Sequence, residues 1–172
     1  MAMAGNIVNT FRMLFGYQMK KILLLGLLLS QLCVFAQVSI ANLSSANASF
    51  CQTKTSMALM KPEIQYGHFI FNAPDKITWK YQNNSSLQLP SPMLDLIRKA
   101  VSGDLSVLDK EFNMEWNKQE LVLTPKQKQL KRIFSAITIA FETSGVAKKV
   151  VLKELNGDIT TIEFMNLKYT KR

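Results

Sequence analysis

The residues whose types and spacing best suit covalent catalysis are three carboxylates close together in the sequence, Asp104, Asp109 and Glu111. A pair of carboxylates can divide the roles of general acid and general base in a hydrolysis. No second ligand group in the sequence converges on them. We therefore do not expect an enzyme. The hydrolase alternative predicts that replacing Asp104 and Asp109 abolishes function.

The other reactive side chains are isolated. His68 is the only histidine, so a histidine-based metal cluster cannot form. The chain contains no G-x-S-x-G, P-loop or dinucleotide-binding motif. Cys33 and Cys51 are the two cysteines, and removal of the first 36 residues would leave Cys51 unable to form an internal disulfide. We expect structural roles for His68 and Cys51, and no metal or cofactor.

The N-terminal part of the chain has the pattern of a secretory signal peptide. Lys20 and Lys21 precede an aliphatic run over 22–29, and Val34 and Ala36 have the small or short side chains typical of a cleavage site. The run is shorter than the about 20 residues of a membrane-spanning helix. We predict cleavage after Ala36 and export to the periplasm. An uncleaved anchor and a lipoprotein signal ending at Cys33 are the alternatives.

Residues 37–172 are long enough for one domain with a single core. All but three of the 21 basic residues and all 12 acidic residues lie there, which gives this part a net charge of +6. The basic residues are spread along the chain and match no nucleic-acid-binding motif, so we expect no nucleic acid partner. A basic surface could meet an anionic membrane or an acidic partner, or it could simply be solvated.

The hydrophobic pattern predicts a mainly antiparallel sheet with one amphipathic helix. Ser91 and Pro92 begin that helix and Gly103 ends it, with Ser91 as the expected N-cap. We expect a short helix or loose lead-in over 37–49, and a basic turn or short helix over 126–134. Strands are expected over 50–60, 64–71, 77–81, 112–116, 121–124, 137–141, 150–155 and 159–164.

The last two strands flank Asn156-Gly157-Asp158, a strong hairpin signal. A two-residue loop would pair Val150 with Glu163 and mix apolar with charged residues. A three-residue loop pairs Val150 with Phe164 and Leu152 with Ile162, which places four apolar residues on one face. Because burial of one face determines the register of a strand, we predict the three-residue loop.

Three stretches together resemble the outer-membrane lipoprotein carrier (LolA-like) family, especially its short Bacteroides-type relatives. The first is Phe50-Cys51-Gln52-Thr53-Lys54, similar to the F-x-Q-x-K strand of the family. The second runs from Gly67 through Pro74 to Trp79 and Tyr81, similar to its signature of Gly, an apolar strand, Pro and an aromatic strand. The third covers 121–126 and 156–164.

The resemblance implies an incomplete antiparallel β-barrel, that is, a curved sheet covered by one or two helices, over residues 37–172. It implies a monomeric periplasmic carrier whose concave face binds the acyl chains of lipoproteins. An inner-membrane release complex would deliver the cargo and an outer-membrane receptor would accept it. The alternative is a non-carrier interaction or sensor module with the same fold.

The inward-facing positions of the expected elements nominate the lipid-binding residues. Ile77 and Trp79 match family positions that line the cavity, and Met93, Leu96 and Ile97 would form the lid face. An ordinary closed core explains the same pattern from the residues alone. The nominated residues are Phe69, Phe71, Ile77, Trp79, Tyr81, Met93, Leu96, Ile97, Ile137, Ile139, Phe141, Val150, Leu152, Ile162 and Phe164.

Two features depart from the family pattern. The position before Pro74 often carries an Arg that fastens the lid in some members, and here it is Ala73. The segment between Tyr81 and Ser91 is shorter than in relatives, which usually place more strands there. These departures predict a smaller sheet, a cavity that is shallower or more open, and the absence of the contact by which that Arg fastens the lid.

Overall fold

The computed structural model describes residues 39–83 and 88–172, all within the second of the chain's two units, Gln37–Arg172. The predicted signal peptide and its cleavage site lie outside the described residues. The strands are β1 (Leu43–Thr55), β2 (Glu63–Asn72), β3 (Lys76–Tyr81), β4 (Phe112–Asn117), β5 (Glu120–Pro125), β6 (Phe134–Phe141), β7 (Ala147–Glu154) and β8 (Ile159–Lys171).

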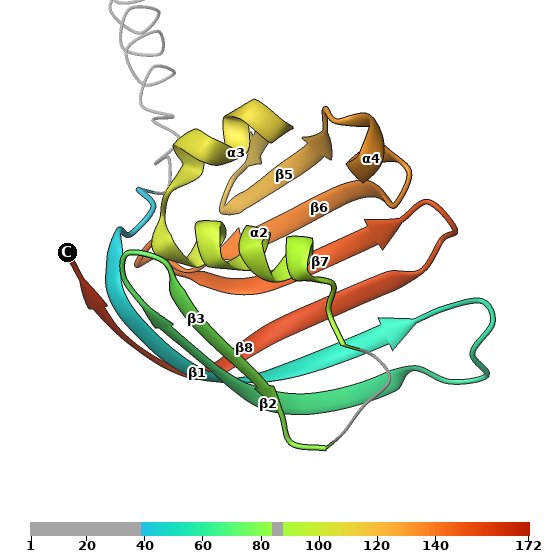
Figure 1. Ribbon diagram of the computed structural model, residues 1–172, viewed down its shortest axis with the longest axis horizontal. Coiled ribbons are helices and arrows are strands. Elements are labelled where there is room, and N and C mark those ends of the chain that lie inside the picture. Colours follow the sequence, from blue (N-terminus) through green and yellow to red (C-terminus); the bar gives the residue numbers. More distant parts are fainter. Residues whose placement is uncertain (1–38, 84–87) are drawn as a thin grey trace, which may run out of the picture. The chain divides into compact units, whose positions relative to one another are not determined.

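These strands form one eight-stranded antiparallel sheet in the order β3-β2-β1-β8-β7-β6-β5-β4. Strands that are consecutive in the sequence pair as hairpins, except β3 and β4, and the pairing of β1 with β8 joins the two halves. The strands β3 and β4 form the edges, so the curved sheet stays open (Figure 1). This confirms the predicted mainly β fold and incomplete barrel.

An irregularity in the central strand pair helps the sheet to curve. The register of β1 against β8 shifts between Asn47 and Ser49, and on β8 Asn166 has a left-handed φ of 54° close to this point. A bulge bends its strand and increases the local twist. The two 13-residue strands at the middle of the sheet therefore contribute to its bend.

In the described part of the chain, three helices accompany the sheet: α2 (Ser91–Ser102), α3 (Leu105–Glu111) and α4 (Lys128–Lys131). The helix α2 lies across the concave face (Figure 1). Its apolar side chains recur at helical spacing and are buried, as predicted. They are Met93, Leu96, Ile97, Ala100 and Val101. Gly103 ends α2 with a φ of 80°, where an added Cβ would also come within 2.5 Å of the carbonyl oxygen of Ala41.

Three local predictions are wrong. The strand expected over 50–60 ends at Thr55, and the segment 37–49, expected to be a short helix or loose lead-in, is a strand from Leu43 onward, because β1 runs from Leu43 to Thr55. Its inward positions carry Ala46 and Ala48, whose small side chains give a weak strand signal although both are buried between two partner strands. Ser91 is not the N-cap, because Pro90 occupies that position and no side chain caps the helix.

The β7–β8 hairpin also differs from its prediction. Val150 pairs with Ile162, and Leu152 with Thr160. The loop has three residues but begins one position earlier than expected, because Gly157 takes the left-handed conformation with a φ of 89°. Asn156 Oδ1 accepts a hydrogen bond from the N–H of Asp158 at 3.0 Å. The shift of register by two leaves each side chain on its predicted face.

Candidate functional site

All fifteen nominated residues belong to one hydrophobic cluster or pack against it. The cluster lies between α2 and the inner face of the sheet. Eleven of the fifteen are buried members of the cluster, and Ile77, Trp79, Tyr81 and Phe164 are partly buried against it. In this conformation the nominated face is therefore covered by α2 and filled by the protein's own side chains over most of its area.

Five aromatic residues from four neighbouring strands form one end of this cluster. We call Phe50, Phe69, Trp79, Tyr81 and Phe164 the aromatic cluster. The Phe50 and Trp79 rings stack with centroids 3.9 Å apart. Tyr81 meets Phe50 edge-on at 5.4 Å, and Phe164 lies 5.3 Å from Phe69. Stacked and edge-on pairs of this kind stabilise beyond simple burial, so this end is a defined aromatic surface.

Gly67 makes the stacking possible. It lies opposite Phe50 on β1 and opposite Tyr81 on β3. A Cβ at this position would run into the Phe50 ring and the carbonyl oxygen of Lys80. Glycine is therefore required at position 67 for the close approach of the Phe50 ring to β2.

Two cavities remain between the sheet and the segment that precedes α2. The rim cavity has a volume of about 290 Å³ and is lined by Gln52, Lys54, Met93, Ile133, Leu152 and Glu154, among others. The tryptophan cavity has a volume of about 310 Å³ and is lined by Trp79, Tyr81 and Leu94, among others. Gln88 and Leu89 line both cavities, so this short segment lies between them.

A chain of two hydrogen bonds fixes that segment to the sheet. The Tyr81 hydroxyl donates to Gln52 Oε1 at 2.9 Å, and the N–H of Leu89 donates to the Tyr81 hydroxyl oxygen at 3.1 Å. Gln52 is 2% exposed. We call Gln52, Tyr81 and Leu89 the latch.

A buried donor lies beside the tryptophan cavity. Trp79 lines this cavity, and its buried Nε1–H has no hydrogen-bond partner among the described residues. Buried polar atoms in proteins are nearly always hydrogen-bonded. An oxygen atom of a bound molecule could supply the missing acceptor.

An ion cluster stands at the mouth of the rim cavity. Lys54 lies 3.3 Å from Asp158 and 3.5 Å from Glu154. Burial of Lys54 disfavours its charge, but the hydrogen bond to Asp158 and the charges of both carboxylates outweigh this and raise its pKa. Lys54 therefore remains a cation at the cavity mouth at neutral pH.

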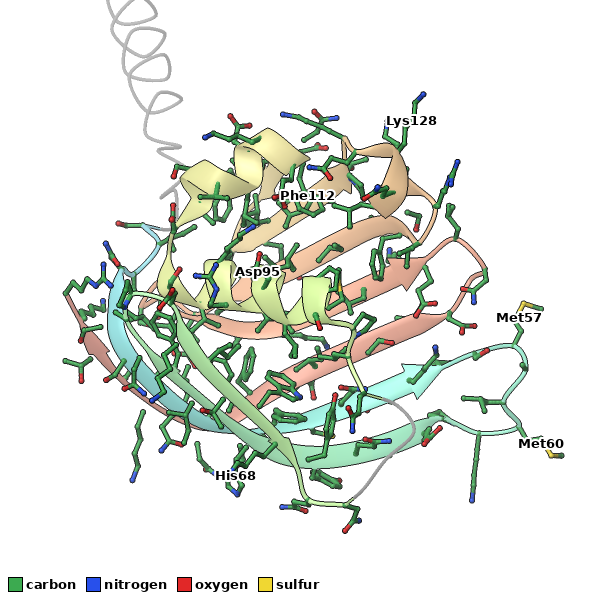
Figure 2. The ribbon with its side chains drawn as sticks, viewed as in Figure 1. Met57, Met60, His68, Asp95, Phe112 and Lys128 are labelled. Atoms are coloured by element: carbon green, nitrogen blue, oxygen red, sulfur yellow. The ribbon has the colours of Figure 1, made fainter. Side chains whose placement is uncertain are left out.

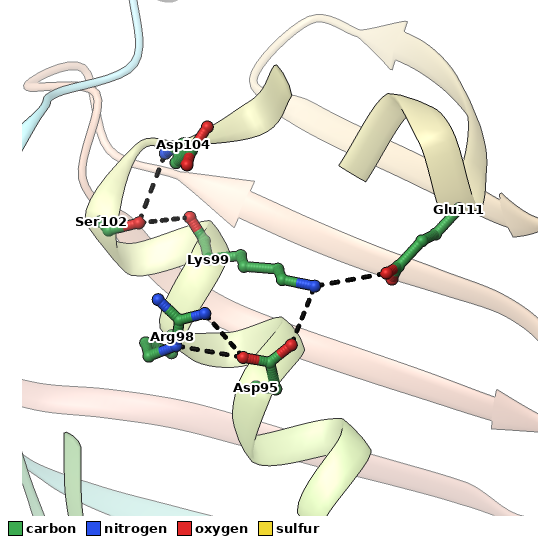
Figure 3. A network of polar contacts seen from close by, with 6 residues as sticks. All are labelled: Asp95, Arg98, Lys99, Ser102, Asp104 and Glu111. Carbon is green, nitrogen blue, oxygen red and sulfur yellow. Dashed lines mark hydrogen bonds and ion pairs between the residues drawn. The ribbon is translucent and has the colours of Figure 1, made fainter. Parts of the chain in front are cut away.

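A second ion network joins α2 to α3 (Figure 3). Asp95 contacts Arg98 at 2.7 Å and Lys99 at 2.8 Å, and Lys99 also lies 3.4 Å from Glu111. Burial opposes the charges of Asp95 and Lys99, but their mutual hydrogen bond outweighs it. It lowers the pKa of Asp95, with help from Arg98, and raises that of Lys99.

The three carboxylates considered for hydrolysis form separate contacts. Glu111 pairs with Lys99 and Asp109 with Lys126, whereas Asp104 accepts a hydrogen bond from Ser106. Within 39–83 and 88–172, no group of His, Cys, Asp and Glu is arranged to hold a metal ion. No described helix has the length and apolar character needed to cross a membrane.

Sequence reasoning missed the polar members of this site. Gln52 and Leu89 were not nominated, although Gln52 occupies an inward position of β1 two residues after Phe50. The available signal was a polar residue at the inward position that directly follows the inward Phe50. Leu89 lies outside any element and contributes its backbone N–H, which no side-chain pattern reveals.

No family model matches the chain, and no curated protein matches it. Similar solved structures include a DUF1329 family protein from Desulfovibrio piger, at 12% identity and a TM-score of 0.36, which covers 78% of this chain and 88% of that one. A LolA superfamily protein from Nitrosomonas europaea matches at 7% identity and a TM-score of 0.29, covering 77% and 89%. Likenesses at this level do not bear on function.

Proposed function

We propose that this protein is a periplasmic carrier that binds the acyl chains of lipoproteins between α2 and the concave face of the sheet. The observation that carries the proposal is the pair of cavities that share Gln88 and Leu89 in their linings. If this segment lifts with α2, the two cavities become one groove lined in part by Trp79 and Tyr81 of the aromatic cluster. Each cavity is now near the lower end of the about 300–1,000 Å³ typical of ligand sites.

The energetics of opening suit reversible binding. Lifting α2 would expose Met93, Leu96 and Ile97, at a cost of about 1.5–3 kcal/mol each. A bound acyl chain recovers about 0.8 kcal/mol for each buried methylene group. A chain of about ten carbons therefore offsets most of the opening cost. Near-balance between these terms favours a carrier that can release its cargo.

A polar group of the protein would orient the bound acyl chain. The free Nε1–H of Trp79 would donate to an ester or amide carbonyl oxygen at the head of the chain. The rest of the groove needs no directional contacts, because an acyl chain has none. In this proposal the protein performs no covalent step, receives cargo from an inner-membrane release complex and passes it to an outer-membrane receptor.

Photo-crosslinking in cells tests the proposal. A photoreactive residue replaces Leu89, which lines both cavities, or Asn113, which is exposed on β4 as the matched control. We expect acylated proteins or lipid to be captured from position 89 and not from position 113. Capture of neither at position 89 would refute carriage.

The alternative is an interaction or sensor module with the same fold. The near-complete filling of the inner face favours it, since Phe69, Ile139 and Val150 are 0% exposed. Mass spectrometry of the protein purified under native conditions separates the two functions. Co-purified lipid supports the carrier, whereas a stable protein partner without lipid supports the module.

A further inference from the structure

Three chain connections lie together at one end of the sheet. They are the β1–β2 loop (56–62), the β5–β6 connection that contains α4 (126–133) and the β7–β8 turn (155–158). Thr55 pairs with Ile159, and the N–H of Leu155 donates to the carbonyl oxygen of Ile133 at 3.0 Å. We call these three connections the basic rim; they lie on the right in Figure 1.

Exposed apolar side chains gather at this rim. Of the eleven large apolar residues that are exposed in the described part of the chain, seven lie on the basic rim or within two residues of it. Met57 and Met60 are 94% and 106% exposed and extend beyond the sheet (Figure 2). Ile133 and Leu155 add 49% and 60% exposed side chains. The turns at the opposite end, 73–75, 118–119 and 142–146, carry none of the eleven.

The same rim carries cations without counter-ions. Among the described residues, Lys61, Lys128, Lys131 and Arg132 are exposed and form no ion pair. The nearby carboxylates of Glu154 and Asp158 are already paired with Lys54. Within the three connections five basic residues stand against one acidic residue, Asp158. The rim therefore combines protruding apolar side chains with a net positive charge.

We propose that the basic rim docks on an anionic lipid bilayer, with the Met57–Met60 tip in the interfacial layer and the α4 cations against the headgroups. Apolar insertion and basic attraction are the two signals that together give stable peripheral membrane binding. A partner protein of acidic surface would use the cations but would not explain methionines that project from a loop tip.

The rim cavity opens at this surface, because Lys54, Ile133 and Glu154 line it. Docking would place its mouth beside the bilayer, where a chain could pass between lipid and protein. This last step rests on the proposed carrier function, but the docking does not. Membrane binding and capture of cargo at position 89 are separate measurements, so either can fail alone.

Vesicle flotation of the exported protein tests the docking. The vesicles contain phosphatidylethanolamine and phosphatidylglycerol, and vesicles of phosphatidylcholine serve for comparison. The rim variants are Met57→Ser with Met60→Ser, and Lys128→Gln with Lys131→Gln. The matched controls are Met165→Ser on β8, and Lys148→Gln with Lys168→Gln, all exposed positions away from the rim.

We expect the wild type to float with the anionic vesicles only. Each rim variant should lose at least about tenfold in binding, because each basic residue and each inserted apolar group adds to membrane affinity. The controls should bind like the wild type. In Met60→Trp, the emission should shift to the blue on binding. Absence of flotation, or equal losses in rim and control variants, would overturn the proposal.

Discussion

The N–H of Leu89 donates a hydrogen bond to the hydroxyl oxygen of Tyr81 at 3.1 Å. This contact joins the end of β3 to the segment that begins α2. The same hydroxyl donates to Gln52 of β1, so one oxygen atom connects two strands to the helix that covers the concave face. Opening of the face in the proposed carrier therefore requires this oxygen to change partners.

Replacement of Tyr81 by Phe should loosen α2 without removing an aromatic ring. Loss of the hydroxyl removes both hydrogen bonds, with an expected destabilisation of about 1–2 kcal/mol in urea unfolding. The amide of Leu89 should exchange with solvent faster than in the wild type. The control is Tyr66→Phe, whose hydroxyl makes no hydrogen bond within the described residues and is exposed. Unchanged exchange at Leu89 would show that the latch does not hold the segment.

Replacement of Gly67 by Ala should disturb the aromatic cluster. The added methyl group would meet the Phe50 ring and the Lys80 carbonyl, and overpacking of this kind costs about 1–3 kcal/mol. Because Phe50 stacks on Trp79, the near-ultraviolet circular dichroism and Trp79 emission should change. Gly157→Ala is the comparison, since no atom lies near its added Cβ. It should lose stability only through its positive φ and leave both spectra as they are.

The fold could be predicted from the sequence because its signals were local. The alternation of Ile77, Trp79 and Tyr81 defines the inward face of β3, and the Met93, Leu96 and Ile97 spacing defines the buried face of α2. Burial of one face then determines the direction of each side chain. The nominated residues could thus be assigned to one cluster before the strand order was known.

The features that could not be predicted depended on contacts between segments that are distant in the sequence. The start of β1 is determined by its pairing with β2 and β8. Small residues such as Ala46 and Ala48 give no sequence signal for that pairing. The helix α3 has one buried residue, Leu108, and so lacks an amphipathic pattern. The latch uses the backbone of Leu89, and the filling of the concave face by α2 follows from packing that no single segment encodes.

The α2–α3 ion network predicts an acid-sensitive contribution to stability. The pKa of Asp95 is lowered in the folded protein, whereas an unfolded Asp titrates near about 3.9. The stabilisation is therefore complete above that value and is lost as the pH falls through the folded pKa. Asp95→Asn should flatten the dependence of unfolding free energy on pH below about 4.

The same network can be followed by titration of the Asp95 carboxyl in nuclear magnetic resonance spectra. Lys99→Met should raise the pKa of Asp95 toward its ordinary value, because its partner at 2.8 Å is removed. Lys126→Met, which removes the exposed partner of Asp109, is the matched control and should leave Asp95 unchanged. An Asp95 pKa that does not move in Lys99→Met would contradict the assignment.

The indole N–H of Trp79, which has no partner among the described residues, should affect ligand affinity according to whether the ligand has a carbonyl oxygen at its head. Trp79→Phe removes the Nε1–H but no hydrogen bond within the described residues, so its effect on folding should come from lost packing alone. In the proposed carrier, affinity for an acyl ester should fall by about a further 0.5–1.5 kcal/mol relative to a hydrocarbon of equal length, because only the ester offers an acceptor. Competition with a fluorescent fatty acyl probe measures both affinities. Equal losses for the ester and the hydrocarbon would mean that this N–H does not contact the cargo, whereas a loss confined to the ester would place the carbonyl oxygen beside Trp79.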